Sequence, residues 1–523
     1  MSQTGLILVV VLVCVVSMAT EAKRILLLSY PMKSHTNEMR SIGEELIRQG
    51  HEVYGALPPT YPGLEEMQSS TKVQYIIYKM AVPDLYTGFD ADSVPSEAME
   101  DYIKITFMED LLYNVEPYFP ASAPCINTLS DQDLFQKLSG LHFDLALIDG
   151  FMQSRCFYVL AYRLGIPYVT LVTQYEPWLQ RNPALPSFVP FPVGTGDYGY
   201  TDRMTFWQRL YNTYILFKWS GYPGVEYLSD DLVTKYAPEV PAVTLNHLAH
   251  QSLLWLLNTD LLLDFARPQM PNMVEVGGLT TRPARGIPSE LDEFVSGAEH
   301  GVIIVSFSSW GASLPNRMIK SFLEAFKKVP QRVVWANPHS ELTDVPDHIK
   351  IMEWIPQNDL LGHNNTKLFI THCGANGQFE ALYHAVPMVA MPMFGDQPYN
   401  AMRAERKGIA TRLDLLTFTP ADLVEAIKQT IDGDSQKKIQ KLSKIFKSRP
   451  LTPVQRSVDW IGHILEHGGE HLHSYALDMP AYQYLMLDIL AFVVAVFLGV
   501  SFLVCCLIRV VCFRGDSRKT KTE

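Results

Sequence analysis

The hydrophobic positions of this chain fall into short aliphatic runs that alternate with helical patterns, in two separate series. The first series comprises Arg24 to Tyr30, His51 to Leu57, Val73 to Tyr78, Phe143 to Asp149 and Pro167 to Thr173. The second comprises Gly301 to Ser309, Arg332 to Asn337, Ile349 to Trp354, Leu368 to Cys373 and Pro387 to Met393. Strands that alternate with helices form parallel sheets covered by those helices. We therefore predict an α/β fold with two doubly wound domains that meet at a cleft.

The segment between the two series is rich in proline and glycine, and we interpret 258–291 as a linker. This predicts a first domain at 23–257 and a second at 292–475, followed by a juxtamembrane segment at 476–488. Within the first domain, the stretch from Pro177 to Tyr200 interleaves helix breakers with aromatic residues, which excludes a long helix. We expect a loop there that lines a pocket; a plain surface excursion is the alternative.

Both ends of the chain carry apolar segments. Gly5 to Val16 is apolar and is followed by small and polar residues up to Ala22, which predicts a signal peptide at 1–22. A retained anchor or a buried strand is the alternative. Ile489 to Ile508 is long and apolar enough to cross a hydrocarbon core of roughly 30 Å, so we predict a transmembrane helix at 489–508.

The tail at 509–523 carries several basic residues, which places it in the cytoplasm and the globular part in the lumen, as in a single-pass type I protein. Lys519 and Lys521 stand fifth and third from the end, like the dilysine retrieval signal of endoplasmic-reticulum membrane proteins. A solvated basic tail is the alternative.

Composition narrows the class of protein. With 523 residues, 47% hydrophobic and 19% charged, the chain has room for two or three domains of roughly 150 residues each. Its net charge of −12 opposes nucleic acid as a partner. Of seven cysteines, Cys125, Cys156 and Cys373 lie between the apolar ends, so at most one disulfide forms there. The sequon at Asn364 is a candidate glycosylation site whose use the sequence leaves open.

One continuous region carries a family signature. It runs EWIPQNDLLGH at 353–363, LFITHCGANGQFE at 368–380 and PMVAMPMFGDQPYN at 387–400. This region resembles the UDP-glycosyltransferase family, which includes glucuronosyltransferases and glucosyltransferases. The resemblance implies the GT-B fold, in which two Rossmann-like domains face each other across a cleft, and a UDP-sugar donor bound by the second domain.

The middle block has the features of a diphosphate site. A strand delivers His372 to its carboxyl end, where open α/β sheets bind ligands. Gly374 and Gly377 then begin a helix, whose N-terminus favours negative charge and whose small residues admit a close approach. His372 and Asn376 add hydrogen-bond donors, and Glu380, one turn later, is placed to accept hydrogen bonds from both ribose hydroxyls.

The flanking blocks take their roles from the family pattern. Trp354 is expected to stack on uracil and Gln357 to bind the polar edge of the nucleoside. Asp396 and Gln397 match the pair that hydrogen-bonds the hydroxyls of the transferred sugar. Taken singly, Trp354 also fits a role in core packing, and Glu380 also fits a solvated position on a helix. The fixed order of all these residues argues against both alternatives.

A phosphate contact is expected upstream. Ser306 and Ser309 resemble the phosphate-binding loop that follows a strand in this family. Ser308 departs from the pattern, because many members have glycine there.

The resemblance also implies a catalytic pair in the first domain. His35, in the loop after the first strand, matches the general base, and Asp149 matches the acid that orients it. Asp144 is the competing acid, but it begins the same strand and so lies at the other edge of the sheet. The implied mechanism is a direct, inverting displacement that needs no metal or other cofactor. The triplet Asp90-Ala-Asp92 has the form of a metal-binding motif and is expected to be a solvated loop.

We expect an enzyme that moves a glucuronosyl or glucosyl group from a UDP-sugar to a hydroxyl of a small lipophilic acceptor, anchored in the endoplasmic reticulum membrane. Homo- or hetero-oligomers are left open. The alternatives are a non-catalytic partner subunit that binds UDP-sugar, against which His35 and Asp149 argue, and an adhesion or receptor protein. The latter predicts β-sandwich patterning or dense cysteines, and the sequence has neither.

Overall fold

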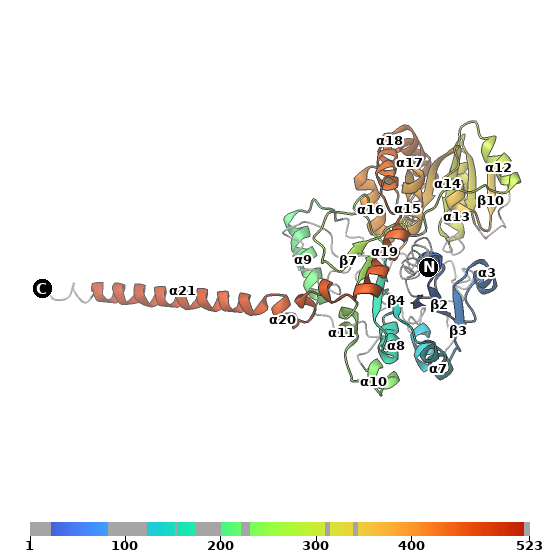
Figure 1. Ribbon diagram of the computed structural model, residues 1–523. Helices are drawn as coiled ribbons and strands as arrows, with labels where there is room; N and C mark the ends of the chain where they lie inside the picture. Colours follow the sequence, from blue (N-terminus) through green and yellow to red (C-terminus); the bar gives the residue numbers. More distant parts are fainter. Residues whose placement is uncertain are drawn as a thin grey trace, which may run out of the picture.

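Two parallel sheets form the body of the protein in this computed structural model, which describes residues 22–81, 123–151, 154–173, 200–220, 231–308, 314–337, 342 and 344–516 (Figure 1). Within these residues, the first sheet has seven strands in the order β3-β2-β1-β4-β5-β6-β7. The second has six, in the order β10-β9-β8-β11-β12-β13. Each order runs outward in both directions from its early central strand, β1 or β8, which is the doubly wound topology. The predicted α/β fold with two such domains is confirmed.

The strands of the first sheet are β1 (Arg24–Leu28), β2 (Glu52–Leu57), β3 (Gln74–Ile77), β4 (Leu145–Asp149), β5 (Tyr168–Val172), β6 (Trp255–Leu257) and β7 (Met273–Glu275). Those of the second are β8 (Val302–Ser306), β9 (Arg332–Ala336), β10 (Ile349–Met352), β11 (Thr366–Thr371), β12 (Met388–Ala390) and β13 (Ala410–Arg412). The central strands β1, β4 and β8 are almost wholly aliphatic, because helices cover both faces of a parallel sheet.

Helices surround both sheets. Those of the first half are α2 (Lys33–Arg48), α3 (Leu64–Ser70), α6 (Ala123–Ser130), α7 (Gln132–Leu141), α8 (Cys156–Leu164), α9 (Phe206–Ser220), α10 (Leu232–Tyr236) and α11 (Leu245–His250). Those of the second are α12 (Ser289–Ser296), α13 (Asn316–Phe326), α14 (Gln357–Leu361), α15 (Ala375–His384), α16 (Gln397–Lys407), α17 (Pro420–Asp432), α18 (Ser435–Lys447) and α19 (Pro453–His467). The short 3-10 helices η4 (Glu470–Leu472) and η5 (Tyr475–Leu477) and the helices α20 (Ala481–Tyr484) and α21 (Leu487–Asp516) follow.

The predicted linker needs correction. β7 lies inside 258–291 and is the last strand of the first sheet, where it pairs with β6. The same segment is tied to the second domain by charged side chains: Arg282 pairs with Asp359 and Asp260 pairs with Arg449. The segment is therefore an ordered part that contacts both domains.

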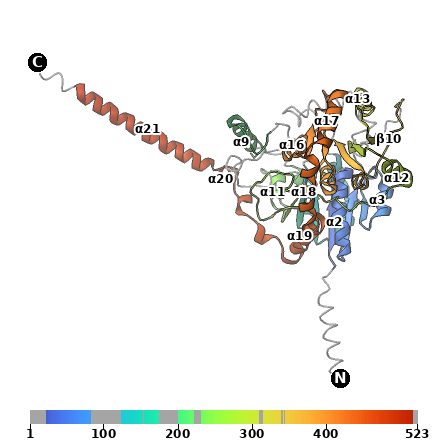
Figure 2. The same cartoon turned by 90° about the horizontal axis from the view of Figure 1, so that it is seen from above.

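The end of the predicted second domain also differs. Helix α19 leaves that domain and packs against α2 of the first (Figure 2). Val458, Ile461 and Ile464 lie in the same hydrophobic cluster as strand residues of the first sheet. The pattern could not reveal this, because an amphipathic helix shows which face is buried but not against which partner.

Cys125 on α6 and Cys156 on α8 form a disulfide with a Cα–Cα distance of 5.5 Å. Cys373 is buried and free. The prediction of at most one disulfide among these three cysteines is confirmed.

A long apolar helix extends away from the body. In α21, the 24 residues Leu487–Val510 have a mean hydropathy of 2.9, and none of the most apolar window is buried. The helix includes the predicted span 489–508 and is a candidate transmembrane segment. Several predictions concern residues outside the described ranges: the signal peptide up to residue 21, Asp90 and Asp92, the loop at 177–199, and Ser309.

Candidate active site

His35 lies in the first turn of α2, just beyond the carboxyl end of β1. The sequence predicts a loop at this position. In the structure, the connection occupies only residues 29–32, and the helix has already begun at Lys33. His35 is therefore held by a helix at the edge of the sheet where doubly wound folds bind their ligands.

Asp149 ends β4, the strand that pairs with β1, so the two residues reach the same edge. The distance between His35 Nδ1 and Asp149 Oδ2 is 2.7 Å. The backbone N–H groups of Tyr30 and Phe151 donate to the two oxygens of Asp149, each at 3.0 Å. These bonds fix the carboxylate, which in turn orients the imidazole.

Asp144, the alternative acid, lies at the opposite edge of the sheet. Its carboxylate accepts a hydrogen bond of 2.8 Å from the backbone N–H of Arg24 and lies 3.7 Å from Lys23 Nζ. Since Arg24 begins β1 and His35 follows its end, Asp144 is far from the imidazole, and Asp149 is the acid that pairs with it.

The environment of His35 favours its charged form. Burial lowers the pKa of His35, but the charge and hydrogen bond of Asp149, with smaller effects of Glu38 and Asp396, outweigh it and raise the pKa to about 9. His35 therefore carries a proton at neutral pH. When the ring is neutral, an N–H on Nδ1 facing Asp149 leaves Nε2 as the basic nitrogen.

Glu38, one turn after His35, is a functional candidate that sequence reasoning missed. It is 2% exposed, and its Oε1 accepts a hydrogen bond of 2.8 Å from Asn376 Nδ2 in the other domain. Burial raises the pKa of Glu38 to about 7, although His35 and Asn376 favour its ionised form. An acid one helical turn from the predicted base is the sequence signal that could have identified it.

The predicted diphosphate site is a strand, a tight turn and a helix. β11 ends at Thr371, Gly374 is the N-cap of α15, and Asn376 and Gly377 lie in the first helical turn. A Cβ added to Gly374 would lie 2.6 Å from His372 Nε2, so glycine allows the imidazole to lie against the turn. The backbone N–H groups that begin a helix have no partners within it and suit an anion.

His372 differs from His35 in its charge. Burial lowers the pKa of His372 to about 4, and a backbone hydrogen bond with Ser306 offsets this only in part. Its Nδ1 is buried without a hydrogen-bond partner among the described residues. At neutral pH the imidazole of His372 is therefore uncharged, and toward a diphosphate it can act as a hydrogen-bond donor but not as a cation.

At the nucleoside end, Trp354 is 60% exposed, so core packing does not explain it. Lys33 Nζ lies 5.1 Å from the centroid of its ring. Gln357, the first residue of α14, donates a hydrogen bond of 2.7 Å from Nε2 to Glu380 Oε2. Burial raises the pKa of Glu380 to about 7, while the bond from Gln357 and the charge of Arg282 oppose that shift.

At the sugar end, Asp396 is the N-cap residue of α16, and its Oδ2 accepts a hydrogen bond of 2.6 Å from Asn400. Burial raises the pKa of Asp396. Gln397 is 4% exposed, and its Oε1 accepts the backbone N–H groups of Met393 and Phe394 at 2.9 and 3.2 Å. Its oxygen is thus used within the protein, so a hydrogen bond from Gln397 to a sugar would come from its NH₂ group.

The predicted phosphate loop is described only at its start. Ser306 ends β8, is 4% exposed, and its Oγ accepts the backbone N–H of Ser308 at 3.3 Å. Ser308 has a φ of 55°, the left-handed region in which glycine costs least. This backbone conformation is a physical reason for glycine at that position in many members of the family that the sequence resembles.

The start of α2 faces the segment from Trp354 to Gln397 at three points. Lys33 lies over Trp354, Glu38 accepts from Asn376, and the charges of His35 and Asp396 influence each other. The structure thus brings the predicted base close to the nucleoside, diphosphate and sugar ends of the predicted donor site, where the two domains meet.

The sequence matches the family described as "UDP-glucoronosyl and UDP-glucosyl transferase" over residues 25–521. The chain belongs to this family. It is 32% identical to UDP-glucuronosyltransferase 1A9 of Mus musculus over 520 residues, 95% of this chain and 94% of that protein. It is also 32% identical to UDP-glucuronosyltransferase 2A3 of Cavia porcellus, with 94% of each chain covered.

Solved structures of glycosyltransferases share the fold of this UDP-glycosyltransferase. A structure of UGT2 of Phytolacca americana, complexed with UDP-2fluoro-glucose and pterostilbene, aligns with a TM-score of 0.58 at 18% identity and covers 85% of this chain and 99% of that one. The glycotransferase of kitacinnamycin aligns with a TM-score of 0.56 at 19% identity, over 84% of this chain and 98% of that one. The expected GT-B fold is thereby confirmed, and the chain is a glycosyltransferase.

Proposed function

We propose that this UDP-glycosyltransferase moves a glucosyl or glucuronosyl group to a hydroxyl of a small lipophilic acceptor in one inverting displacement. The His35–Asp149 pair carries the proposal, because it faces the start of α15 and Asp396 across the cleft. A base opposite a donor site is the arrangement that a direct displacement requires.

In the proposed reaction, neutral His35 removes the acceptor proton through Nε2, and the acceptor oxygen attacks the anomeric carbon. The bond to UDP breaks from the opposite face, so the configuration inverts. Asp149 stabilises the imidazolium that forms, and the N-terminus of α15 takes the growing negative charge of UDP. The proposed reaction uses no metal ion, so chelation should leave the rate unchanged.

The experiment is a screen of UDP-glucose, UDP-glucuronate, UDP-galactose and UDP-N-acetylglucosamine against a panel of phenols and alcohols, with UDP release as the readout. His35→Ala should lose roughly 10²- to 10⁴-fold in turnover, the usual contribution of a general base, and still bind UDP. Near-normal turnover of this variant would refute the assignment. UDP binding without transfer from any donor would favour the non-catalytic partner subunit instead.

For location we propose the endoplasmic reticulum membrane, with the two domains in the lumen. The apolar α21, the basic residues of the tail and the Cys125–Cys156 disulfide, which forms in an oxidising compartment, support this. Asn364 is exposed, so the lumenal orientation can be tested at its sequon. Loss of mass on endoglycosidase treatment of the wild type, but not of Asn364→Gln, would support it; cleavage of the domains by protease added to sealed microsomes would contradict it.

A further inference from the structure

Helix α9 carries large apolar side chains on two opposite faces. One face is buried: Ile215 and Leu216 belong to the core of the first domain. The other face is open to solvent although its side chains are large. Its residues and exposed fractions are Phe206 at 60%, Trp207 at 73%, Leu210 at 52% and Tyr214 at 53%. We call these four residues the α9 patch.

The four residues form a continuous strip. Phe206, Leu210 and Tyr214 are spaced four apart, which places them one above another on a helix, and Trp207 lies beside them. The rings of Phe206 and Trp207 have centroids 5.1 Å apart. Large side chains exposed together in this way mark a contact surface, whereas scattered single ones do not.

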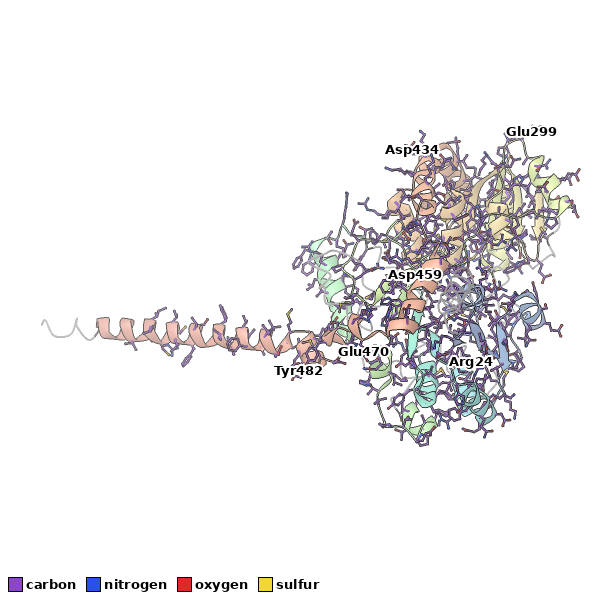
Figure 3. All side chains as sticks on the ribbon, in the orientation of Figure 1. Arg24, Glu299, Asp434, Asp459, Glu470 and Tyr482 are labelled. Carbon is purple, nitrogen blue, oxygen red and sulfur yellow. A yellow bond between two sulfur atoms is a disulfide. The ribbon has the colours of Figure 1, made fainter. Side chains whose placement is uncertain are left out.

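The position of the patch indicates what covers it. Figures 1 and 2 both show α9 on the side of the body from which α21 leaves. The junction itself carries exposed apolar side chains, among them Tyr482, labelled in Figure 3, and Met486. A bilayer that contains α21 therefore meets the body on the side where α9 lies.

We propose that the α9 patch lies in the headgroup region of the membrane that α21 spans. Trp and Tyr prefer this region because their rings are apolar at one end and polar at the other. Arg203 and Arg209 are exposed beside the patch and can reach lipid phosphates. The body then contacts the bilayer at two places, α9 and the start of α21, and its orientation is fixed.

This contact would hold the first domain against the surface into which lipophilic compounds partition. That consequence, unlike the contact itself, rests on the proposed function, in which His35 of the first domain removes the proton of a lipophilic acceptor. The contact itself can be measured without an activity assay.

The experiment uses the full chain in nanodiscs of phosphatidylcholine, prepared at one chain per disc, with part of the lipid brominated near the headgroup. Bromine quenches nearby tryptophan, and α21 contains none. Because α9 contains a second tryptophan, Trp219, the comparison is made in a Trp219→Phe background. We expect quenching in that background and loss of most of it when Trp207→Phe is added. The matched control is Trp354→Phe, which removes another tryptophan that is more than half exposed but lies beside Lys33, where the two domains meet; it should keep the quenching.

Two results would overturn the proposal. One is equal quenching with and without Trp207→Phe in that background. The other is quenching of Trp207 that is stronger with lipid brominated near the bilayer centre, since an interfacial helix lies at the headgroup boundary. If a second copy of the chain covered the patch instead, the patch would not contact lipid in discs that hold one chain. Quenching would then be equal with and without Trp207→Phe, which is the first of these two results.

Discussion

Glu38 on α2 and Asn376 on α15 join the two domains through a hydrogen bond of 2.8 Å. Asn376 lies in the first turn of the helix whose N-terminus is expected to bind the diphosphate. Its Nδ2 therefore has two candidate acceptors, the carboxylate of Glu38 and a phosphate oxygen. When Glu38 is ionised, its negative charge opposes the diphosphate at the same place.

This relationship predicts that Glu38→Gln binds UDP more tightly than the wild type at high pH. The pKa of Glu38 is about 7, so the wild-type carboxyl is charged above that pH and neutral below it. Removing a charge this close should gain ~1 kcal/mol or more, roughly fivefold in affinity, at pH 8. Well below pH 7 the two proteins should bind alike. Calorimetric titration of UDP at both pH values measures the difference.

Glu44→Gln is the control for that experiment, because Glu44 lies on the same helix with its carboxyl exposed beside Arg40. It should match the wild type at both pH values. Weaker binding by Glu38→Gln at both pH values would mean that the contact with Asn376 supports the donor site instead of competing with it.

The second prediction concerns the pH dependence of transfer. His35 must be neutral to act as a base, and its pKa is raised to about 9. With an alcohol acceptor, kcat/KM should therefore rise as pH rises above 7, by about tenfold per pH unit, and level off near pH 9. Initial rates of UDP release across this range give the profile.

Asp149→Asn separates the two roles of the acid. Without the charge of Asp149, burial dominates and the pKa of His35 falls, so the profile should level off at a lower pH. The plateau should also be lower, because the ring is no longer oriented. Asp144→Asn, at the opposite edge of the sheet, should keep the wild-type profile. An unchanged profile in Asp149→Asn would exclude Asp149 as the partner that sets this pKa.

Most of the fold follows from the pattern of apolar runs. All ten strands expected from the sequence are present, because most of them lie in apolar runs between turn signals, which are typical of buried parallel strands. The missed strands β6, β7 and β13 have three residues each. β12 is equally short but lies in a longer apolar run, and β6 likewise lies in the apolar run from Leu253 to Leu257, which could have predicted it. β7 and β13 have no such run around them.

The site was predictable to the extent that it is contiguous in sequence. The predicted donor residues follow one another from Trp354 to Gln397, and their order carries the family signature. The contacts across the cleft are different, because Lys33 over Trp354 and Glu38 beside Asn376 depend on how two domains are placed. The charge states of the two histidines could not be predicted from the sequence either. His35 and His372 are the same residue type, but their burial and neighbours shift their pKa values in opposite directions.

The third prediction tests Glu380 as the residue that binds ribose. An ionised carboxylate accepts hydrogen bonds from hydroxyls, and Glu380→Gln keeps the shape while removing the charge. UDP binding should weaken by about 1–3 kcal/mol above pH 7, where the wild-type carboxyl is ionised, given its pKa of about 7. The loss should be smaller for 2′-deoxy-UDP, which lacks one of the hydroxyls. Equal losses for both nucleotides would show that Glu380 does not contact the 2′-hydroxyl.

The fourth prediction compares two glycines of the diphosphate turn. The φ of Gly374 is −58°, which alanine adopts without strain, but its Cβ would lie 2.6 Å from His372 Nε2. The imidazole would have to move, so Gly374→Ala should weaken UDP binding by roughly tenfold, the loss of about one good hydrogen bond. Its thermal stability should change little, because the ring is the end of a side chain that can turn aside.

Gly377→Ala is the matched variant, one turn into the same helix. Its Cβ would meet Gln357 Nε2 and Phe369 at 3.4 Å, an ordinary contact on the protein side of the helix. Alanine also favours the helix by up to about 1 kcal/mol over glycine, so its melting temperature should stay the same or rise. Titration of UDP together with thermal unfolding decides between the two sites. An equal loss of affinity in Gly377→Ala and Gly374→Ala would contradict this explanation, because only Gly374 contacts His372. Both losses would then come from blocking the close approach of the diphosphate to the start of the helix.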